Sequence, residues 1–446
     1  MSELIQIQGL GPLTQSHSEP PLHKVLKAGT IVSCLATVLT AQFLPAIAWI
    51  FWWLAVGLGT GWAWQAGSRV EAHHRQTGLW FQPSTSRGPI AWFFAVVMTG
   101  FYVVLYWWES WFPRVTSPLK SLWVSLEPLS QALRNTPSDK WFLYGTLYTL
   151  FVAIFGVRMF RLYRGQRYHQ IRTFSLIIAQ TLFAFALPGL LRKFSEREFY
   201  LSYFWPLKPE YLFPTGLDGL LASPSLGRAM AWWTVLISLV GVPVLTYFVG
   251  KRWYCSWVCG CGGLAETLGD SFRHLSDRSQ RAWVIEKWMI HSVLGLIVVI
   301  TLGLWYADYS GTQSATVQSL KQWYGFWIGA AFSGVVGVGF YPILGSRVWC
   351  RFGCPQAAIL GLFQRWFSRF RITTNGGQCI SCGNCSAVCE MGIDVKAYAQ
   401  EEKDIVRASC VGCGMCATAC PRGVLKLENG PRESRAHGKP GPLNRD

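Results

Sequence analysis

Long apolar stretches recur along the whole chain, and they constrain its fold more than any other feature. Crossing the hydrocarbon layer of a bilayer, about 30 Å thick, takes about 20 helical residues. Only 14% of the residues are charged, against about 25% in ordinary soluble domains. The sequence therefore predicts an all-α polytopic membrane helix bundle with about eight spans, at residues 28–45, 47–66, 89–108, 141–158, 173–191, 229–250, 288–306 and 323–344.

The basic residues indicate how the bundle is oriented. The formal net charge is +17, and the cations stand between apolar stretches, which suits contact with membrane lipid and not with nucleic acid. We expect both termini and the segment 251–287 to be cytoplasmic, and the loop 307–322 to lie outside. This topology rests chiefly on the loop at 158–172, which has no acid and carries Arg158, Arg161, Arg164, Arg167 and Arg172.

Eight of the 14 cysteines form two compact runs with the same spacing. Three thiolates in one tight loop hold three corners of a cubane, and in two-cluster ferredoxins the fourth cysteine of each run ligates the other cluster. Zinc sites instead use two cysteine pairs. The spacing predicts two [4Fe–4S] clusters in an α+β ferredoxin-like module. One takes Cys379, Cys382, Cys385 and Cys420, and the other takes Cys410, Cys413, Cys416 and Cys389.

A second cysteine pattern is an internal repeat. Residues 250–260 match residues 345–355, 95 positions later, and each copy carries an arginine and a Cys-x3-Cys pair. A spacing of four predicts that each pair lies on one helical face. The candidate redox or metal thiols are Cys255, Cys259, Cys350 and Cys354.

Two matched arms at one membrane surface suggest a shared centre. The options are a further metal or iron–sulfur site, a set of redox-active thiols, or transient copper binding by soft thiolates. The alternative is that these are buried free cysteines beside a turn. Gly260 stands where the second copy has Pro355, and Cys261 adds a fifth thiol.

Twin Cys-x3-Cys motifs at helix ends, followed by two ferredoxin runs, resemble the membrane polyferredoxin family, which includes NosR, NapH and CcoG. The resemblance covers residues 229–421 and none of residues 1–228. It implies a bacterial cytoplasmic (inner) membrane protein with the module in the cytoplasm. It also implies electron transfer between the quinone pool or a cytoplasmic electron donor and a periplasmic or membrane redox enzyme. The alternative is an assembly factor that reduces copper or another cofactor while a metalloenzyme matures.

The chain departs from that family at two points. Glu390 follows Cys389, where a proline is usual, and Gly260 replaces the proline of the first arm. The large flavin-binding N-terminal domain of NosR has no counterpart in this sequence. These differences remove no predicted cluster ligand, but they leave the role of the first arm open.

The outer loop holds a weaker signal. Residues 308–316 resemble, imperfectly, the sequences in which a threonine receives a phosphoester-linked FMN. Thr316 or Thr312 is then the candidate cofactor-binding residue. Serine, glycine and threonine are also ordinary turn residues.

These patterns divide the chain into six segments. We expect a cytoplasmic tail (1–27), N-terminal membrane helices (28–228), a membrane core with the twin motifs (229–362), an interfacial linker (363–377), the ferredoxin-like domain (378–427) and a disordered tail (428–446). Phe363–Phe370, with three arginines nearby, predicts a short interfacial helix.

Overall fold

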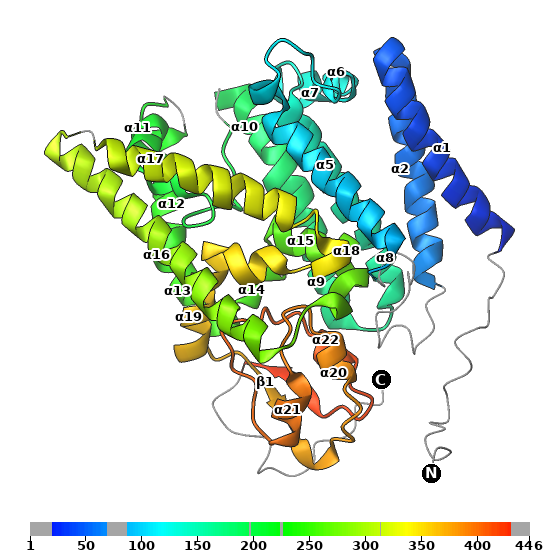
Figure 1. The fold of residues 1–446 in the computed structure, drawn as a ribbon, viewed down its shortest axis with the longest axis vertical. Coiled ribbons are helices and arrows are strands. Elements are labelled where there is room, and N and C mark those ends of the chain that lie inside the picture. The colour runs from blue at the N-terminus through cyan, green and yellow to red at the C-terminus, as the bar shows by residue number, and fades with distance from the viewer. Residues whose placement is uncertain (1–19, 69–86, 196–197, 224–225, 313, 430–446) are drawn as a thin grey trace.

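The structure is a computed structural model that describes residues 20–68, 87–195, 198–223, 226–312 and 314–429. Long helices form a bundle, and a small module that includes the two strands packs against one end of it (Figure 1). The predicted tail 428–446 lies almost wholly outside the described residues.

Seven helices of the described chain are long and apolar enough to cross a membrane. Their bounds lie close to the first seven predicted spans, so an all-α membrane bundle is confirmed. They are α1 (Pro21–Phe43), α2 (Pro45–Ser68), α5 (Pro89–Trp111), α8 (Lys140–Leu162), α9–η1–α10 (Arg167–Ile178, Ala179–Ala186, Leu187–Ser195), α12–η3–α13 (Gly227–Leu236, Ile237–Gly241, Val242–Val249) and α16 (Gln280–Ser310).

The region of the eighth predicted span, 323–344, is arranged differently. The helix there begins earlier, as α17 (Ala315–Tyr324), continues as the π-helix η5 (Gly325–Val336), and gives way to turns before α18 (Tyr341–Leu344). Polar side chains such as Gln318 and Lys321 occupy its first turns. It is therefore not among the seven helices that qualify as spans.

Proline and capping residues set several of the helix starts. Pro21 and Pro89 occupy first-turn positions, where the missing N–H costs nothing. Asp139 caps α8 by accepting a hydrogen bond from the Phe142 amide at 2.7 Å. Leu44 alone separates α1 from α2, and the two helices lie side by side as a tight hairpin (Figure 1).

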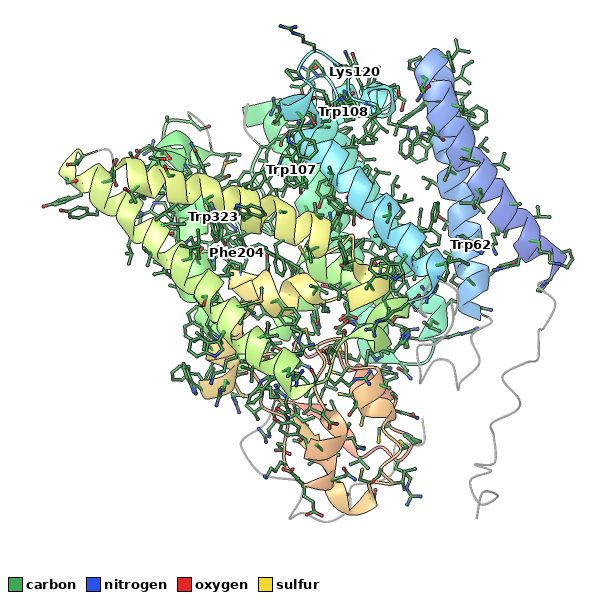
Figure 2. All side chains as sticks on the ribbon, viewed as in Figure 1. Trp62, Trp107, Trp108, Lys120, Phe204 and Trp323 are labelled. Carbon is green, nitrogen blue, oxygen red and sulfur yellow. The ribbon has the colours of Figure 1, made fainter. Side chains whose placement is uncertain are left out.

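Short elements connect the spans at the end of the bundle away from the module. Trp107 and Trp108 lie at this end of α5, as interfacial anchors do (Figure 2). The connecting elements are α6 (Lys120–Val124), α7 (Glu127–Arg134), the 3₁₀ turn η2 (Pro209–Leu212) and α11 (Pro214–Leu221).

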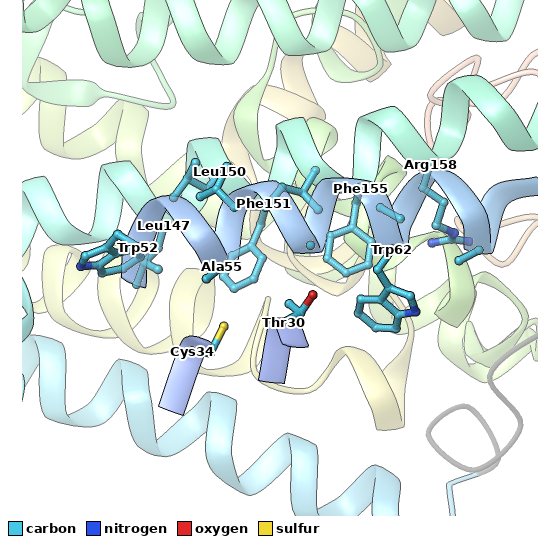
Figure 3. A pocket seen from close by; sticks show the side chains of 15 residues that line it. Thr30, Cys34, Trp52, Ala55, Trp62, Leu147, Leu150, Phe151, Phe155 and Arg158 are labelled. Atoms are coloured by element: carbon cyan, nitrogen blue, oxygen red, sulfur yellow. The ribbon is translucent and has the colours of Figure 1, made fainter. Parts of the chain in front are cut away.

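An almost wholly apolar cavity lies between α1, α2 and α8, where α2 also packs directly against α8 (Figure 3). Cys34 and Thr30 face it from α1, Phe151 and Phe155 from α8, and Arg158 lies at one end. Cys34 is exposed and is not part of the core.

The C-terminal module begins with strand β1 (Arg371–Thr374), which pairs antiparallel with β2 (Leu425–Glu428). The pairing brings Arg371 opposite Glu428, so the module includes residues that the sequence assigned to a linker. The predicted interfacial helix at Phe363–Phe370 is wrong, because α19 (Pro355–Trp366) ends within it. Between the strands lie η7 (Gly376–Gln378), α20 (Asn384–Ala387), α21 (Val395–Gln400) and α22 (Met415–Thr418).

Candidate functional site: two cysteine-lined spaces and a twin-cysteine core

The eight cysteines of the module surround two separate small spaces. Cys379, Cys382, Cys385 and Cys420 line the first, which we call the outer space. Cys389, Cys410, Cys413 and Cys416 line the second, the inner space. These are the same two groups of four that the spacing predicts, with one cysteine of each run crossing to the other group.

The sulfur positions distinguish between a single metal ion and a larger group. Four thiolates on one tetrahedral zinc, with bonds of about 2.3 Å, lie about 3.8 Å apart. Among the described residues, no three cysteines bring their sulfur atoms within 4.8 Å of one another. Within each set, the sulfur atoms are therefore too far apart to bind one zinc ion, and their spacing fits a multi-iron cluster.

The two spaces differ in their exposure. In the outer space Cys382 is exposed to solvent, and Ile380 beside it is 57% exposed. In the inner space Cys410 and Cys416 are buried, at 6% and 5% exposure. The outer space therefore faces solvent, and the inner space faces the bundle.

Side chains from the membrane part hold the loop that carries Cys410 and Cys413. Each of four consecutive carbonyl oxygens, from Cys410 to Cys413, accepts a hydrogen bond from a different side chain. The donors, in order, are Gln364 (2.7 Å), Ser256 (2.7 Å), Tyr168 (2.6 Å) and Arg172. These four hydrogen bonds therefore hold the loop of the inner space against the bundle.

The twin Cys-x3-Cys arms lie directly behind this loop. The four cysteines of the arms are each only 5% or 6% exposed; they are Cys255, Cys259, Cys350 and Cys354. The four residues share one hydrophobic core with Cys410 and Cys416. The structure thus brings both arms together, as the repeat predicts, and places them against the inner space.

The predicted placement of each pair on one helical face is wrong. Cys255 ends the short helix α14 (Arg252–Cys255), whereas Cys259 is the extended residue before α15 (Gly260–Glu266). In the second arm Cys350 lies in η6 (Trp349–Gly353), and Cys354 is the extended residue before α19. A residue before proline avoids the helical conformation, which explains the break at Cys354.

Each arm is introduced by a glycine with positive φ, +77° at Gly250 and +92° at Gly345. The arms are also tied to each other. Arg347, in the second arm, donates a hydrogen bond to the Cys255 carbonyl at 3.0 Å and lies 3.6 Å from the Cys350 sulfur. The Arg347 guanidinium therefore contacts the backbone of the first arm and a thiol of the second.

The thiols of the core differ in acidity. Burial raises the pKa of Cys255 to about 12 and also raises that of Cys354. A hydrogen bond from the Cys261 thiol lowers the pKa of Cys259 to about 7. Cys259 is therefore the thiol of this core that ionises most readily.

A buried ionic network, which the sequence analysis did not identify, joins the arms to the module. Glu266 contacts Arg172, Arg273 and Arg347 at 2.9, 2.5 and 2.7 Å. Glu390 contacts Arg273 and Arg347 at 2.9 and 3.1 Å. Burial opposes ionisation of Glu266, but the three guanidinium groups outweigh it and hold its pKa well below the usual range.

This network explains the unusual residue after Cys389. Glu390 is 1% exposed and supplies a carboxylate to arginines of both the membrane part and the second arm. Glu266, Glu390 and Cys413 also bring three potential metal ligands within 4.8 Å. Because arginines already neutralise both carboxylates, we assign no metal ion to this trio.

Thr312 and Thr316 lie far from the cysteines, beyond the opposite end of α16. Both are exposed, beyond the C-terminal end of α16, whose opposite end contacts α19. At about 1.5 Å per residue, the 31 residues of α16 span about 46 Å. The structure therefore does not bring these threonines to the cysteine core, and a flavin there stays a prediction.

Comparison with known families gives matches over both cysteine regions. Residues 371–421 match the family model described as "4Fe-4S dicluster domain". Residues 231–279 and 325–373 each match the model described as "4Fe-4S binding domain", so the two arms are copies of one unit. The protein therefore has the sequence signature of [4Fe–4S] binding in both regions.

Curated relatives match about a third of the chain. The relative described as "Putative electron transport protein YccM", from Escherichia coli (strain K12), is 28% identical over 177 residues, 37% of this chain and 48% of the relative. The methylamine utilization ferredoxin-type protein MauN of Methylobacillus flagellatus is 28% identical, over 35% of this chain and 54% of the relative. MauN of Paracoccus denitrificans is 29% identical, over 37% and 58%.

The chain spans about half the length of the curated relatives it matches. No solved structure matches it at the significance required of these relatives. Over these regions the chain is similar to [4Fe–4S]-binding families and to relatives named as electron transport or ferredoxin-type proteins.

Proposed function

We propose that this protein transfers electrons through two [4Fe–4S] clusters, one in the outer and one in the inner space. When bound, such clusters take up and release single electrons. The proposed ligands are Cys379, Cys382, Cys385 and Cys420 in the outer space and Cys389, Cys410, Cys413 and Cys416 in the inner space. The names of the relatives, which refer to electron transport and to ferredoxin-type proteins, support this activity.

The docking of the inner-space loop is the observation that carries the proposal. Four consecutive carbonyls bound by bundle side chains hold the inner space against the twin-cysteine core, while the outer space stays open to solvent. This order suits a path from the aqueous face, through the module, to the membrane core. We infer that one end of the path meets quinol or a cytoplasmic donor and that the other meets a redox partner across the membrane.

We propose the twin-cysteine core as the third redox site on that path. Its match to a 4Fe-4S binding domain favours a further iron–sulfur centre on Cys255, Cys259, Cys350 and Cys354. Arg347 adds a positive charge beside it, which offsets the negative charge of thiolate ligands.

Electron paramagnetic resonance of anaerobic membranes tests the proposal. We expect dithionite to produce iron–sulfur signals that are absent from membranes lacking the protein. Appearance of the same signals with a reduced quinol analogue identifies quinol as the donor, and signals with dithionite alone identify a low-potential cytoplasmic donor. Membranes rich in the protein that give no iron–sulfur signal under either reductant would contradict the proposal.

A second candidate function is the reduction or delivery of copper during metalloenzyme assembly. Two observations favour it. The four cysteines of the arms share one buried core with Cys261 packed against it, and the Cys261 thiol lowers the pKa of Cys259 to about 7. We expect anaerobic protein to retain Cu(I) in dialysis and the Cys255→Ser/Cys350→Ser variant to lose it. Equal retention by both proteins would remove this candidate without affecting the clusters of the module.

A further inference from the structure

A cavity lies where the membrane bundle meets the module, outside the outer and inner spaces, and Cys350 of the twin-cysteine core contributes to its lining. Its walls come from the first turns of α16, the second arm and α19 on one side, and from residues 391–409 of the module on the other. Among the described residues that line it, Glu286 is the one acid. Five lining side chains are cations: Lys251, Lys287, Arg351, Arg365 and Arg407.

Two of these cations already have partners. Arg351 contacts Glu286 at 2.6 Å, and the Lys251 ammonium donates to the Ala408 carbonyl at 3.0 Å. Within the described chain, no acid pairs with Lys287, Arg365 or Arg407. Three positive charges therefore border one cavity without a counter-ion, which favours an anion between them.

Aromatic residues place the cavity at the level of lipid headgroups. Trp283, Trp288 and Trp366 line it and are 43%, 71% and 58% exposed. Tryptophan is enriched at this depth of a membrane. Because α16 is about 46 Å long and the hydrocarbon layer is about 30 Å thick, part of the helix extends beyond the hydrocarbon.

We propose that this cavity binds the headgroup of an anionic phospholipid, with its phosphate between Lys287, Arg365 and Arg407. The Arg407 guanidinium lies over the Trp283 ring, 5.2 Å from its centroid. Basic pockets between membrane helices on the cytoplasmic side bind anionic lipid headgroups. Because the module supplies Arg407 and the bundle supplies the other two, the lipid bridges the two parts.

Native mass spectrometry of the detergent-solubilised full chain tests this site. The probes are phosphatidylglycerol and phosphatidylcholine with identical acyl chains. We expect phosphatidylglycerol to bind at least about tenfold more tightly. The Lys287→Gln/Arg365→Gln/Arg407→Gln variant should lose that preference and keep its iron content. Lys287→Gln alone, a change of an exposed side chain, should reduce the preference if the triple variant does not accumulate.

A control of equal charge separates this site from general electrostatics. Arg114→Gln/Lys120→Gln/Arg228→Gln removes three exposed cations elsewhere and should leave the preference intact. Equal loss in both variants, or equal binding of the two lipids by the unaltered chain, would overturn the proposal. Full competition by inorganic phosphate would also overturn the proposal, because it would indicate a site for free anions. Retention of quinone in place of phospholipid would overturn it as well.

Discussion

At the scale of single residues, Glu266 is the centre of the contacts between bundle and module. Its carboxylate meets arginines from α9, from the segment after α15 and from the second arm. All four side chains are at most 2% exposed. Removing one member of a buried ion pair leaves an uncompensated charge, and this costs about 3–5 kcal/mol.

Glu266→Gln should therefore destabilise the fold by about 3–5 kcal/mol. Denaturant titration in mixed micelles, followed by tryptophan fluorescence, measures the change. The control is Glu109→Gln, which breaks a 2.5 Å contact with Lys140. Because Glu109 is 52% exposed, its loss should cost less than about 1 kcal/mol. Similar costs for the two substitutions would show that the network does not hold the module in place.

The sequence predicted part of this site and missed the rest for a clear reason. Cysteine spacing identifies the two groups of four because three ligands of each cluster lie close together in sequence, and the repeated run supplies the fourth. The ionic network has no such signature, since Arg172, Glu266, Arg347 and Glu390 come from distant segments. The one available signal was Glu390, where a proline is usual.

At the scale of elements, the two arms begin with the same backbone conformation. Both Gly250 and Gly345 have positive φ. A side chain at Gly345 would place its Cβ 2.6 Å from the Ser276 hydroxyl oxygen and 3.0 Å from the Ser276 amide. A glycine is therefore required there both by backbone angle and by space.

Gly345→Ala should destabilise the second arm by more than about 1 kcal/mol and lower the iron content of the purified protein. Gly295→Ala is the matched control, because Gly295 lies within α16 with no atom within 4 Å of the added Cβ. We expect the control to match the unaltered protein. Iron analysis and thermal unfolding report both effects, and an unaffected Gly345→Ala protein would refute this account of the arm.

The errors of the sequence analysis at this scale concern how helices end. The length of the apolar stretches predicted seven spans well, because a spanning helix must match the thickness of the membrane. It misplaced the helix at 315–336 because composition gave no sign of the turns that follow Val336. It also placed each Cys-x3-Cys pair on one helical face, whereas the second cysteine of each pair is an extended residue immediately before the next helix.

At the scale of the whole molecule, the module and the arginine-rich connection lie on the same face. Tyr168 and Arg172, in α9, bind the carbonyls of Gly412 and Cys413. The loop after α16 lies at the other end of that helix. Because the positive-inside tendency favours arginine-rich connections on the cytoplasmic side, we propose that the module is cytoplasmic and that Thr312 lies outside.

Labelling with a membrane-impermeant maleimide tests this topology in intact cells. We expect Thr312→Cys to react in intact spheroplasts and Lys403→Cys, on the exposed surface of the module, to react only after permeabilisation. Both side chains are exposed, so access to the reagent is the only difference between them. The reverse pattern would place the module outside and contradict the proposed orientation.

The central claim is that each cluster draws its fourth ligand from the other cysteine run, and double variants test it most directly. Iron and acid-labile sulfide, with electron paramagnetic resonance, are measured on two anaerobically purified proteins. Cys382→Ser/Cys420→Ser changes two residues of the outer space and should lose about four iron atoms and keep the other cluster signal. Cys410→Ser/Cys420→Ser changes one residue of each space and should lose both signals. Loss of both signals in the first variant and of one in the second would contradict the account.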